Sequence, residues 1–112
     1  MKMIDHTIGS GAEATTGARV SVHYTGWLFD ETAPDNKGKK FDSSRDRGDP
    51  FMFPLGAGRV IKGWDEALQQ LRIGDHATLV IPSIIAYGSR AMGEDIPADS
   101  TLIFIIEVIG VK

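Results

Sequence analysis

Residues 60–71, Val-Ile-Lys-Gly-Trp-Asp-Glu-Ala-Leu-Gln-Gln-Leu, carry the only helical pattern in this chain. Its apolar residues recur at the three- and four-residue spacing of an amphipathic helix: Val60, Ile61, Trp64, Ala67, Leu68 and Leu71. Asp65 and Glu66 lie near the start, where the helix dipole favours anions. Gly74 follows as a plausible stop. We therefore predict one short helix, around which the rest of the chain must fold.

The segments on both sides of this helix have the pattern of strands. Residues 18–29 alternate between apolar and polar side chains, which is typical of a half-buried strand. Residues 51–53 and 77–81 are shorter strand candidates. Residues 101–111 are apolar at both odd and even positions, which predicts a central strand covered on both faces.

Polar segments connect these elements. Residues 29–38 contain Pro and Gly and predict a long hairpin loop, residues 40–42 can resume the strand, and residues 43–50 are charged and rich in turn formers. One helix can cover only one face of a sheet. We therefore predict an α+β fold, a twisted antiparallel sheet wrapped around one short helix. A single domain over residues 1–112 is expected, with residues 1–17 as an N-terminal strand or extension.

The composition of the chain argues against several classes of function. The chain has 112 residues and a formal charge of −3, so no overall positive field draws it to nucleic acid or anionic lipid. It has no cysteine, which excludes thiolate catalysis and fits a reducing compartment. Neither a signal-like nor a membrane-spanning apolar run is visible. We expect a cytoplasmic monomer that binds neither nucleic acid nor membrane.

Familiar catalytic patterns are missing. The three histidines, His6, His23 and His76, lie far apart, and we expect solvated surface residues rather than a metal site or a cofactor site. Gly56, Gly58 and the residues after them lack the third glycine and the Lys-Ser/Thr pair of nucleotide loops, so a turn before the helix is the better interpretation. Nine aromatic residues in so small a chain indicate instead an apolar concave site.

Three segments resemble the FKBP family of peptidyl-prolyl isomerases, which bind the macrolides tacrolimus and rapamycin. They are VHYTGWL at 22–28, GKKFDSSRDR at 38–47 with PFMFPLGAGRVIKGWDEAL at 50–68, and AYG at 86–88 followed by IP at 96–97 and TLIFIIEV at 101–108. The resemblance covers residues 18–110. It implies the twisted sheet and single helix inferred above, an isomerase that rotates Xaa-Pro bonds without a cofactor, and proline-containing or partly folded proteins as partners.

The resemblance also implies a pocket with assigned residues. Trp64 would form its floor and Asp42 would lie at one side. Tyr87 would reach in from a loop, and Ile96 would close the same side. The implied catalytic residues are Asp42, Tyr87, Trp64, Tyr24 and Phe104. The implied residues that bind substrate or inhibitor are Tyr24, Phe41, Asp42, Arg47, Phe51, Val60, Ile61, Trp64, Ala86, Tyr87, Ile96 and Phe104. Arg47 and Tyr24 are the expected partners of Asp42, since a carboxylate beside an apolar pocket must be paired.

The chain departs from the family pattern around this pocket. Asp95 and the charged loop at residues 89–95 replace less polar residues, Ala98 replaces a second proline, Arg59 lies at the rim, and the loop at residues 29–39 is long. Two alternatives to an isomerase therefore stay open at this point. One is a binding module for proline-containing partners, and the other is a structural domain without a ligand.

Overall fold

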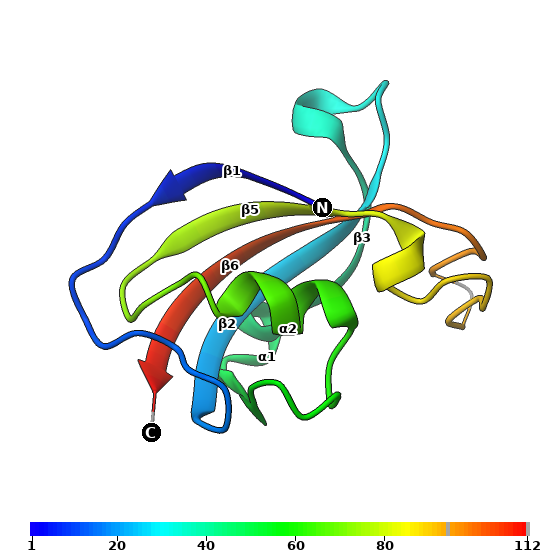
Figure 1. Ribbon diagram of the computed structural model, residues 1–112. Coiled ribbons are helices and arrows are strands. Elements are labelled where there is room, and N and C mark those ends of the chain that lie inside the picture. The colour runs from blue at the N-terminus through cyan, green and yellow to red at the C-terminus, as the bar shows by residue number, and fades with distance from the viewer. Residues whose placement is uncertain (94, 112) are drawn as a thin grey trace.

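The computed structural model describes residues 1–93 and 95–111, and it contains a six-stranded antiparallel sheet with the order β1-β5-β6-β2-β3, in which β4 also pairs with β2. Helix α2 (Lys62–Leu68) lies against the concave face of this twisted sheet (Figure 1). The strands are β1 (Lys2–Thr7), β2 (Arg19–Phe29), β3 (Lys37–Ser43), β4 (Phe51–Pro54), β5 (His76–Ile81) and β6 (Leu102–Val111). This arrangement confirms the predicted fold class.

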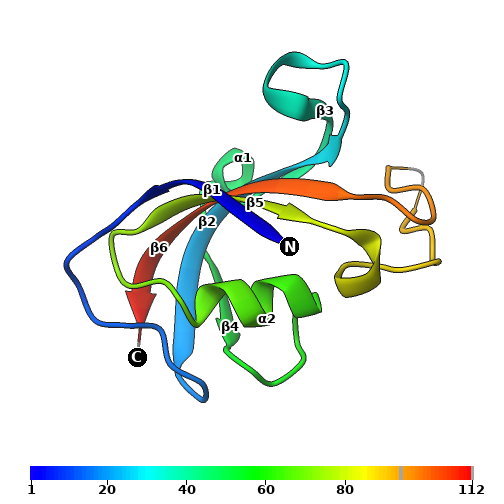
Figure 2. The same cartoon turned by 45° about the horizontal axis from the view of Figure 1, so that its top comes forward.

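Strand β2 has two successive partners along one edge. Its first residues, from Arg19 to Val22, pair with β4, whereas the residues from Thr25 onward pair with β3. Tyr24 lies between these two stretches, where the chain leaves the sheet to form the turn between β3 and β4. Figure 2 shows β4 and α2 below the curved sheet on the same side. The edge of the sheet therefore opens beside Tyr24, opposite the start of α2.

Helix α2 is shorter than the predicted segment. Val60 lies in a bend and Ile61 is extended, at φ −59° and ψ 148°, so the helix begins at Lys62, and it ends at Leu68 rather than Leu71. Trp64 and Leu68 are buried against the sheet. A Cβ on Gly63 would lie 2.7 Å from the Ile81 Cγ2 atom, so glycine is required for the close approach of helix and sheet.

Strand β6 is central, as predicted, but its two faces are covered unequally. The alternate residues that share one face are all buried: Leu102, Phe104, Ile106 and Val108. On the other face Ile103 is buried, whereas Ile105 is half-buried and Ile109 is 41% exposed. The predicted cover on both faces is therefore wrong for the second half of the strand, because helix α2 packs on one side of the sheet only.

The N-terminal segment joins the sheet as β1, which pairs with β5. Buried Asp75 accepts hydrogen bonds from the Gly9 amide and pairs with the His6 Nε2 atom at 2.6 Å. His23 bonds to Ser44, and His76 lies 3.2 Å from Glu107. His6 and His76 are exposed, as expected, and His23 is half-buried, but each of the three also has a polar partner that the sequence did not indicate.

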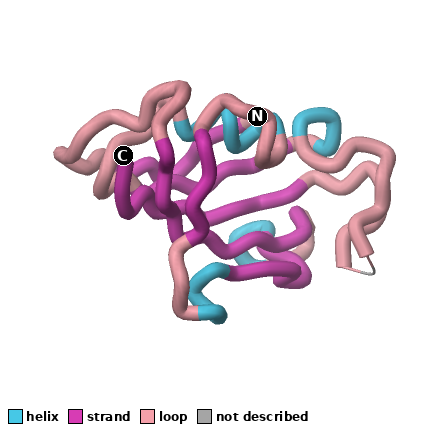
Figure 3. Tube along the Cα trace, turned by 90° about the horizontal axis from the view of Figure 1, so that it is seen from below, coloured by secondary structure: helices cyan, strands magenta, loops and turns pink. Residues whose placement is uncertain are grey.

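Connecting loops gather at the two ends of the sheet, as the view from below shows (Figure 3). The hairpin loop at residues 30–36 contains a short 3-10 turn (Pro34–Asn36) and, with Ile4, Thr78 and Ile103, lines a cavity of about 260 Å³. A second 3-10 turn, Ser83–Ile85, follows β5. Within the described part of the chain, every helix is too short or too polar to cross a membrane.

Candidate active site

A cavity of about 160 Å³ lies between the open edge of the sheet and the start of α2. Its walls come from four strands, the helix and two loops. The lining residues are Tyr24, Phe41, Asp42, Phe51, Arg59, Val60, Ile61, Trp64, Tyr87 and Phe104. Nine of these ten were assigned to the pocket from the sequence. The tenth, Arg59, was noted only as a rim residue.

Trp64 lies at the centre of the aromatic lining and is only 4% exposed. Its ring meets those of Tyr24 and Phe104 edge-on, with centroids 4.9 Å and 5.2 Å away. Such edge-to-face pairs each add to stability beyond the area that they bury. Among the described residues, the buried Trp64 Nε1–H has no hydrogen-bond acceptor. The indole is therefore held by aromatic contacts rather than by a polar bond.

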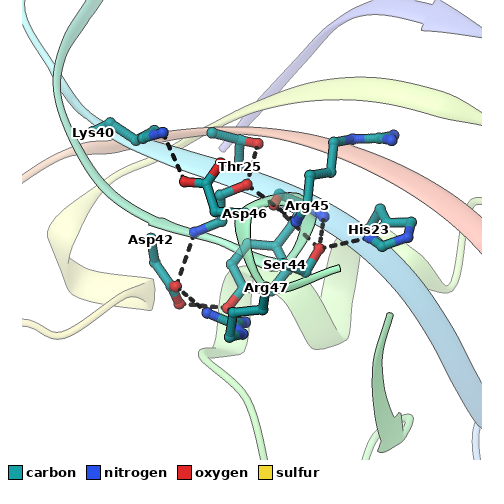
Figure 4. A network of polar contacts seen from close by, with 10 residues as sticks. His23, Thr25, Lys40, Asp42, Ser44, Arg45, Asp46 and Arg47 are labelled. Carbon is teal, nitrogen blue, oxygen red and sulfur yellow. Dashed lines mark hydrogen bonds and ion pairs between the residues drawn. The ribbon is translucent and has the colours of Figure 1, made fainter. Parts of the chain in front are cut away.

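Asp42 lies at the end of β3 and is bonded on both oxygens (Figure 4). One oxygen accepts the Tyr24 hydroxyl, and the other accepts the Ser43 amide and lies 2.5 Å from the Arg47 guanidinium. Arg47 also donates to the Tyr24 hydroxyl at 3.0 Å. Both partners expected for Asp42 are thus in place.

Arg47 reaches Asp42 because residues predicted as a turn form one helical turn, α1 (Ser44–Arg47). The Ser43 side chain caps this turn by accepting the Arg45 amide, and Gly48 ends it in the left-handed region at φ 78°. A serine cap and a terminal glycine are the local signals that could have predicted it. The turn brings the guanidinium back over the end of β3.

The network fixes the protonation states at neutral pH. Burial alone would raise the pKa of the Asp42 carboxyl, but the hydrogen bonds from Tyr24 and Arg47 lower it below its usual value. Burial, followed by the negative charge of Asp42, raises the pKa of Tyr87. Burial and the hydrogen bond to Asp42 likewise raise the pKa of Tyr24. Asp42 is therefore ionised at neutral pH, whereas both tyrosines keep their hydroxyl protons.

Two hydrogen-bond donors face the cavity without a protein acceptor. Neither the Tyr87 hydroxyl nor the Ile61 N–H bonds to another described residue. Ile61 immediately precedes α2, so its amide belongs to the donors that a helix start leaves unsatisfied. Both residues line the cavity. The site therefore combines an apolar floor with a few donors that suit carbonyl oxygens.

Three predicted contact residues do not line the cavity. Arg47 is engaged with Asp42 and Tyr24. Ile96 is 6% exposed and belongs to the core, and Ala86 packs against that core. The expectation that Ile96 closes one side of the pocket stays a prediction. Direct substrate contacts of all three residues stay predictions.

Within the charged loop at residues 89–95, Asp95 has an ionic partner of its own. Asp95 does not line the cavity and pairs instead with Lys39 at 3.0 Å, through two exposed side chains. An exposed ion pair of this kind is worth about 0–1 kcal/mol. Glu94, in the same loop, lies outside the described residues.

The chemistry of this site suits an uncharged ring flanked by carbonyl groups. No potential metal site of three or more His, Asp or Glu side chains is found within residues 1–93 and 95–111. The cavity is lined mainly by aromatic and aliphatic side chains, and its one carboxylate is bonded to neighbours rather than poised to take a proton. Fold and site together define a class of small protein with an apolar, aromatic-lined cavity between a curved sheet and a short helix.

Comparison with known proteins identifies the family of this chain. The sequence pattern of the family described as FKBP-type peptidyl-prolyl cis-trans isomerase matches residues 11–109. FK506-binding protein 1A of Neurospora crassa is 50% identical over 105 residues, which are 93% of this chain and 82% of that protein. FK506-binding protein 1 of Aspergillus oryzae is 45% identical over 95% of this chain and 93% of its own length.

A bacterial relative, the FK506-binding protein of Neisseria meningitidis serogroup A, is 47% identical over 92% of this chain and 88% of its own length. The chain belongs to the FKBP-type peptidyl-prolyl cis-trans isomerase family. Its activity is that of a peptidyl-prolyl cis-trans isomerase, an enzyme that accelerates rotation about the peptide bond before proline.

Proposed function

We propose that this isomerase holds the proline ring of its substrate on Trp64 in the aromatic cavity and turns the Xaa-Pro bond there without a nucleophile or a proton transfer. The observation that carries the proposal is the aromatic lining with two donors that have no acceptor among the described residues, the Tyr87 hydroxyl and the Ile61 N–H. Proline-containing segments of partly folded chains are the proposed substrates, so that the enzyme assists folding. Macrolides of the FK506 and rapamycin type are the proposed inhibitors.

The physical basis lies in the peptide bond itself. Its rotation barrier of about 18–20 kcal/mol comes from resonance that makes the C–N bond partly double. The planar amide is more polar than the twisted one, so an apolar, water-poor cavity raises the planar ground state relative to the transition state. Uncatalysed exchange takes about 10–100 s, and bringing it to milliseconds requires roughly 5–6 kcal/mol.

Each polar group has a proposed part in this reaction. The Tyr87 hydroxyl and the Ile61 N–H bond to substrate carbonyls and hold the chain on either side of the turning bond. The Asp42 carboxylate, fixed by Tyr24 and Arg47, orients the wall and acts electrostatically on the twisting carbonyl. The rings of Tyr24, Phe51 and Phe104 enclose the proline. A cytoplasmic location and a monomeric state stay predictions from the sequence.

The direct test is cis-trans exchange of a Leu-Pro-Phe peptide, followed by NMR with and without rapamycin. We expect rapid exchange that is abolished when the macrolide is stoichiometric with the enzyme, because both ligands occupy one cavity. Chemical shift changes should map to the lining residues. Exchange that continues with bound macrolide would show that turnover takes place elsewhere and would refute the proposed cavity.

Asp42→Asn and Tyr87→Phe should each lower kcat/KM of the folded enzyme by roughly fivefold to tenfold, the value of about one net hydrogen bond. Both changes nearly keep the shape of the side chain, so the loss reports on charge or on donation. Asp46→Asn is the matched control, since Asp46 is an exposed carboxylate that bonds Lys40 outside the cavity. Unchanged kcat/KM in both cavity variants would mean that the polar roles are wrong.

A further inference from the structure

The cavity wall contains two charged side chains, and only one of them is neutralised. Asp42 is paired with Arg47. The other, Arg59, is exposed and forms no ion pair with any residue in the described part of the chain. Arg59 therefore offers an unpaired positive charge at the mouth, although the chain as a whole carries −3.

The loop that carries Arg59 is fixed to the helix. The Asp65 carboxylate, in the first turn of α2, accepts the Gly56 amide at 2.9 Å and the Gly58 amide at 3.2 Å. Both glycines have positive φ, at 83° and 72°, so the loop has a defined bend just before Arg59. The Arg59 backbone is thus held at the mouth. Asp65 keeps its negative charge but forms no ion pair with the Arg59 guanidinium.

The position of the free Ile61 amide indicates which part of a substrate comes closest to Arg59. If the proline ring lies on Trp64, as proposed above, the proline carbonyl can accept the Ile61 N–H. The next residue of the substrate then leaves the cavity along the segment of Val60 and Arg59. This step depends on the proposed function, since it takes the binding mode of the ring as given.

We propose that Arg59 makes this enzyme favour prolines that are followed by an acidic residue, whose carboxylate pairs with the guanidinium at the mouth. Arg59 acts here as a specificity-determining residue. It takes no part in the rotation itself, which the aromatic and aliphatic side chains of the lining promote. The substrate class is therefore Xaa-Pro-Glu and Xaa-Pro-Asp sequences.

The test compares C-terminally amidated peptides Ala-Leu-Pro-Glu and Ala-Leu-Pro-Gln, which differ only in the charge after proline. We expect kcat/KM to be about two- to fivefold higher for the glutamate peptide, the size of one exposed ion pair. The ratio should fall to about one in Arg59→Gln and invert in Arg59→Glu. It should also shrink between about 0.01 M and 1 M salt, where the Debye length falls from about 30 Å to about 3 Å.

Two controls separate this effect from others. Lys62→Gln removes an exposed cation three residues further along, outside the cavity wall, and should keep the wild-type ratio. The peptides Ala-Glu-Pro-Leu and Ala-Gln-Pro-Leu move the charge to the residue before proline, where we expect no comparable preference. An acid preference found only at that position would overturn the proposal.

The outcomes also distinguish this inference from the proposed function. Equal, macrolide-sensitive acceleration of both peptides would refute the role of Arg59 and leave the proposed cavity intact. A glutamate preference that survives in Arg59→Gln would refute it as well. Acceleration of neither peptide would overturn both the cavity mechanism and the specificity that depends on it.

Discussion

Replacing Trp64 with alanine should destabilise the folded protein by about 3–5 kcal/mol, the usual cost of removing a buried Trp or Phe side chain. The indole is 4% exposed and contacts four aromatic rings, so its loss leaves a hole that the neighbours cannot fill. For a small domain with a total stability of about 5–15 kcal/mol, this is a large part of the whole. Urea unfolding measures it directly.

The same substitution removes the proposed floor of the cavity. We expect kcat/KM of the folded fraction to fall by roughly tenfold to a hundredfold, because the ring loses part of the burial worth about 0.8 kcal/mol per CH₂. Trp64→Phe keeps an aromatic floor and removes the unpaired Nε1 donor, so it should lie between wild type and alanine in both measurements. This milder variant keeps the prediction testable if Trp64→Ala does not fold.

Trp27, the other tryptophan, provides the control. It is half-buried on β2 under the Lys37 ammonium group, 4.9 Å from the ring centroid, and does not line the cavity. Trp27→Ala should cost less stability and leave kcat/KM per folded molecule near the wild-type value. If Trp64→Ala folded and kept full activity while Trp27→Ala lost it, the assigned floor would be wrong.

The second large effect is expected at Gly26, in the middle of β2. A Cβ at this position would lie 2.6 Å from the Phe104 Cε1 atom and 2.6 Å from the Phe41 Cζ atom. Both rings line the cavity, and they pack edge-on with centroids 5.6 Å apart. Phe104 is buried, so it cannot swing away. Gly26→Ala should therefore cost about 1–3 kcal/mol by overpacking.

Activity should fall with stability in this variant, since the two displaced rings form part of the cavity. Gly110→Ala is the matched control, because Gly110 is also a strand glycine and its added Cβ would meet only ordinary contacts at 3.9 Å or more. The control should be neutral or slightly stabilising, because alanine restricts the unfolded chain. Equal stability and activity of the two variants would contradict the close packing at Gly26.

Local periodicity predicted most of the elements. The three- and four-residue spacing around Trp64 identified α2, and alternation identified β2 and β5. Each pattern reflects which face of the element is buried, and this can be read from residues that are close together in the sequence. The pattern overestimated α2, because Val60 and Ile61 have helical spacing but lie before the helix and line the cavity. It missed α1, since one turn is too short to show a period.

The site was predicted through a different route. Periodicity could not have joined Tyr24, Asp42 and Tyr87, which come from three separate parts of the chain. The resemblance to a family supplied that grouping, and nine of the ten lining residues were named by it. The lining also includes Arg59, which was expected only at the rim, and does not include Ile96, because a family pattern reports residue types at aligned positions rather than the burial of each side chain in this chain.

The sequence by itself thus determined the α+β class, the order of the strands along the chain and the family, since these depend on local patterns and on motifs of fixed spacing. Only the tertiary structure decided which charged groups meet: Arg47 pairs with Asp42, and Lys39 pairs with Asp95. It also decided that Arg59 lines the cavity without an ionic partner among the described residues. The reason is physical. Burial and pairing depend on which groups the fold brings within a few ångströms of each other, and the local sequence around a residue does not indicate which distant residues these will be.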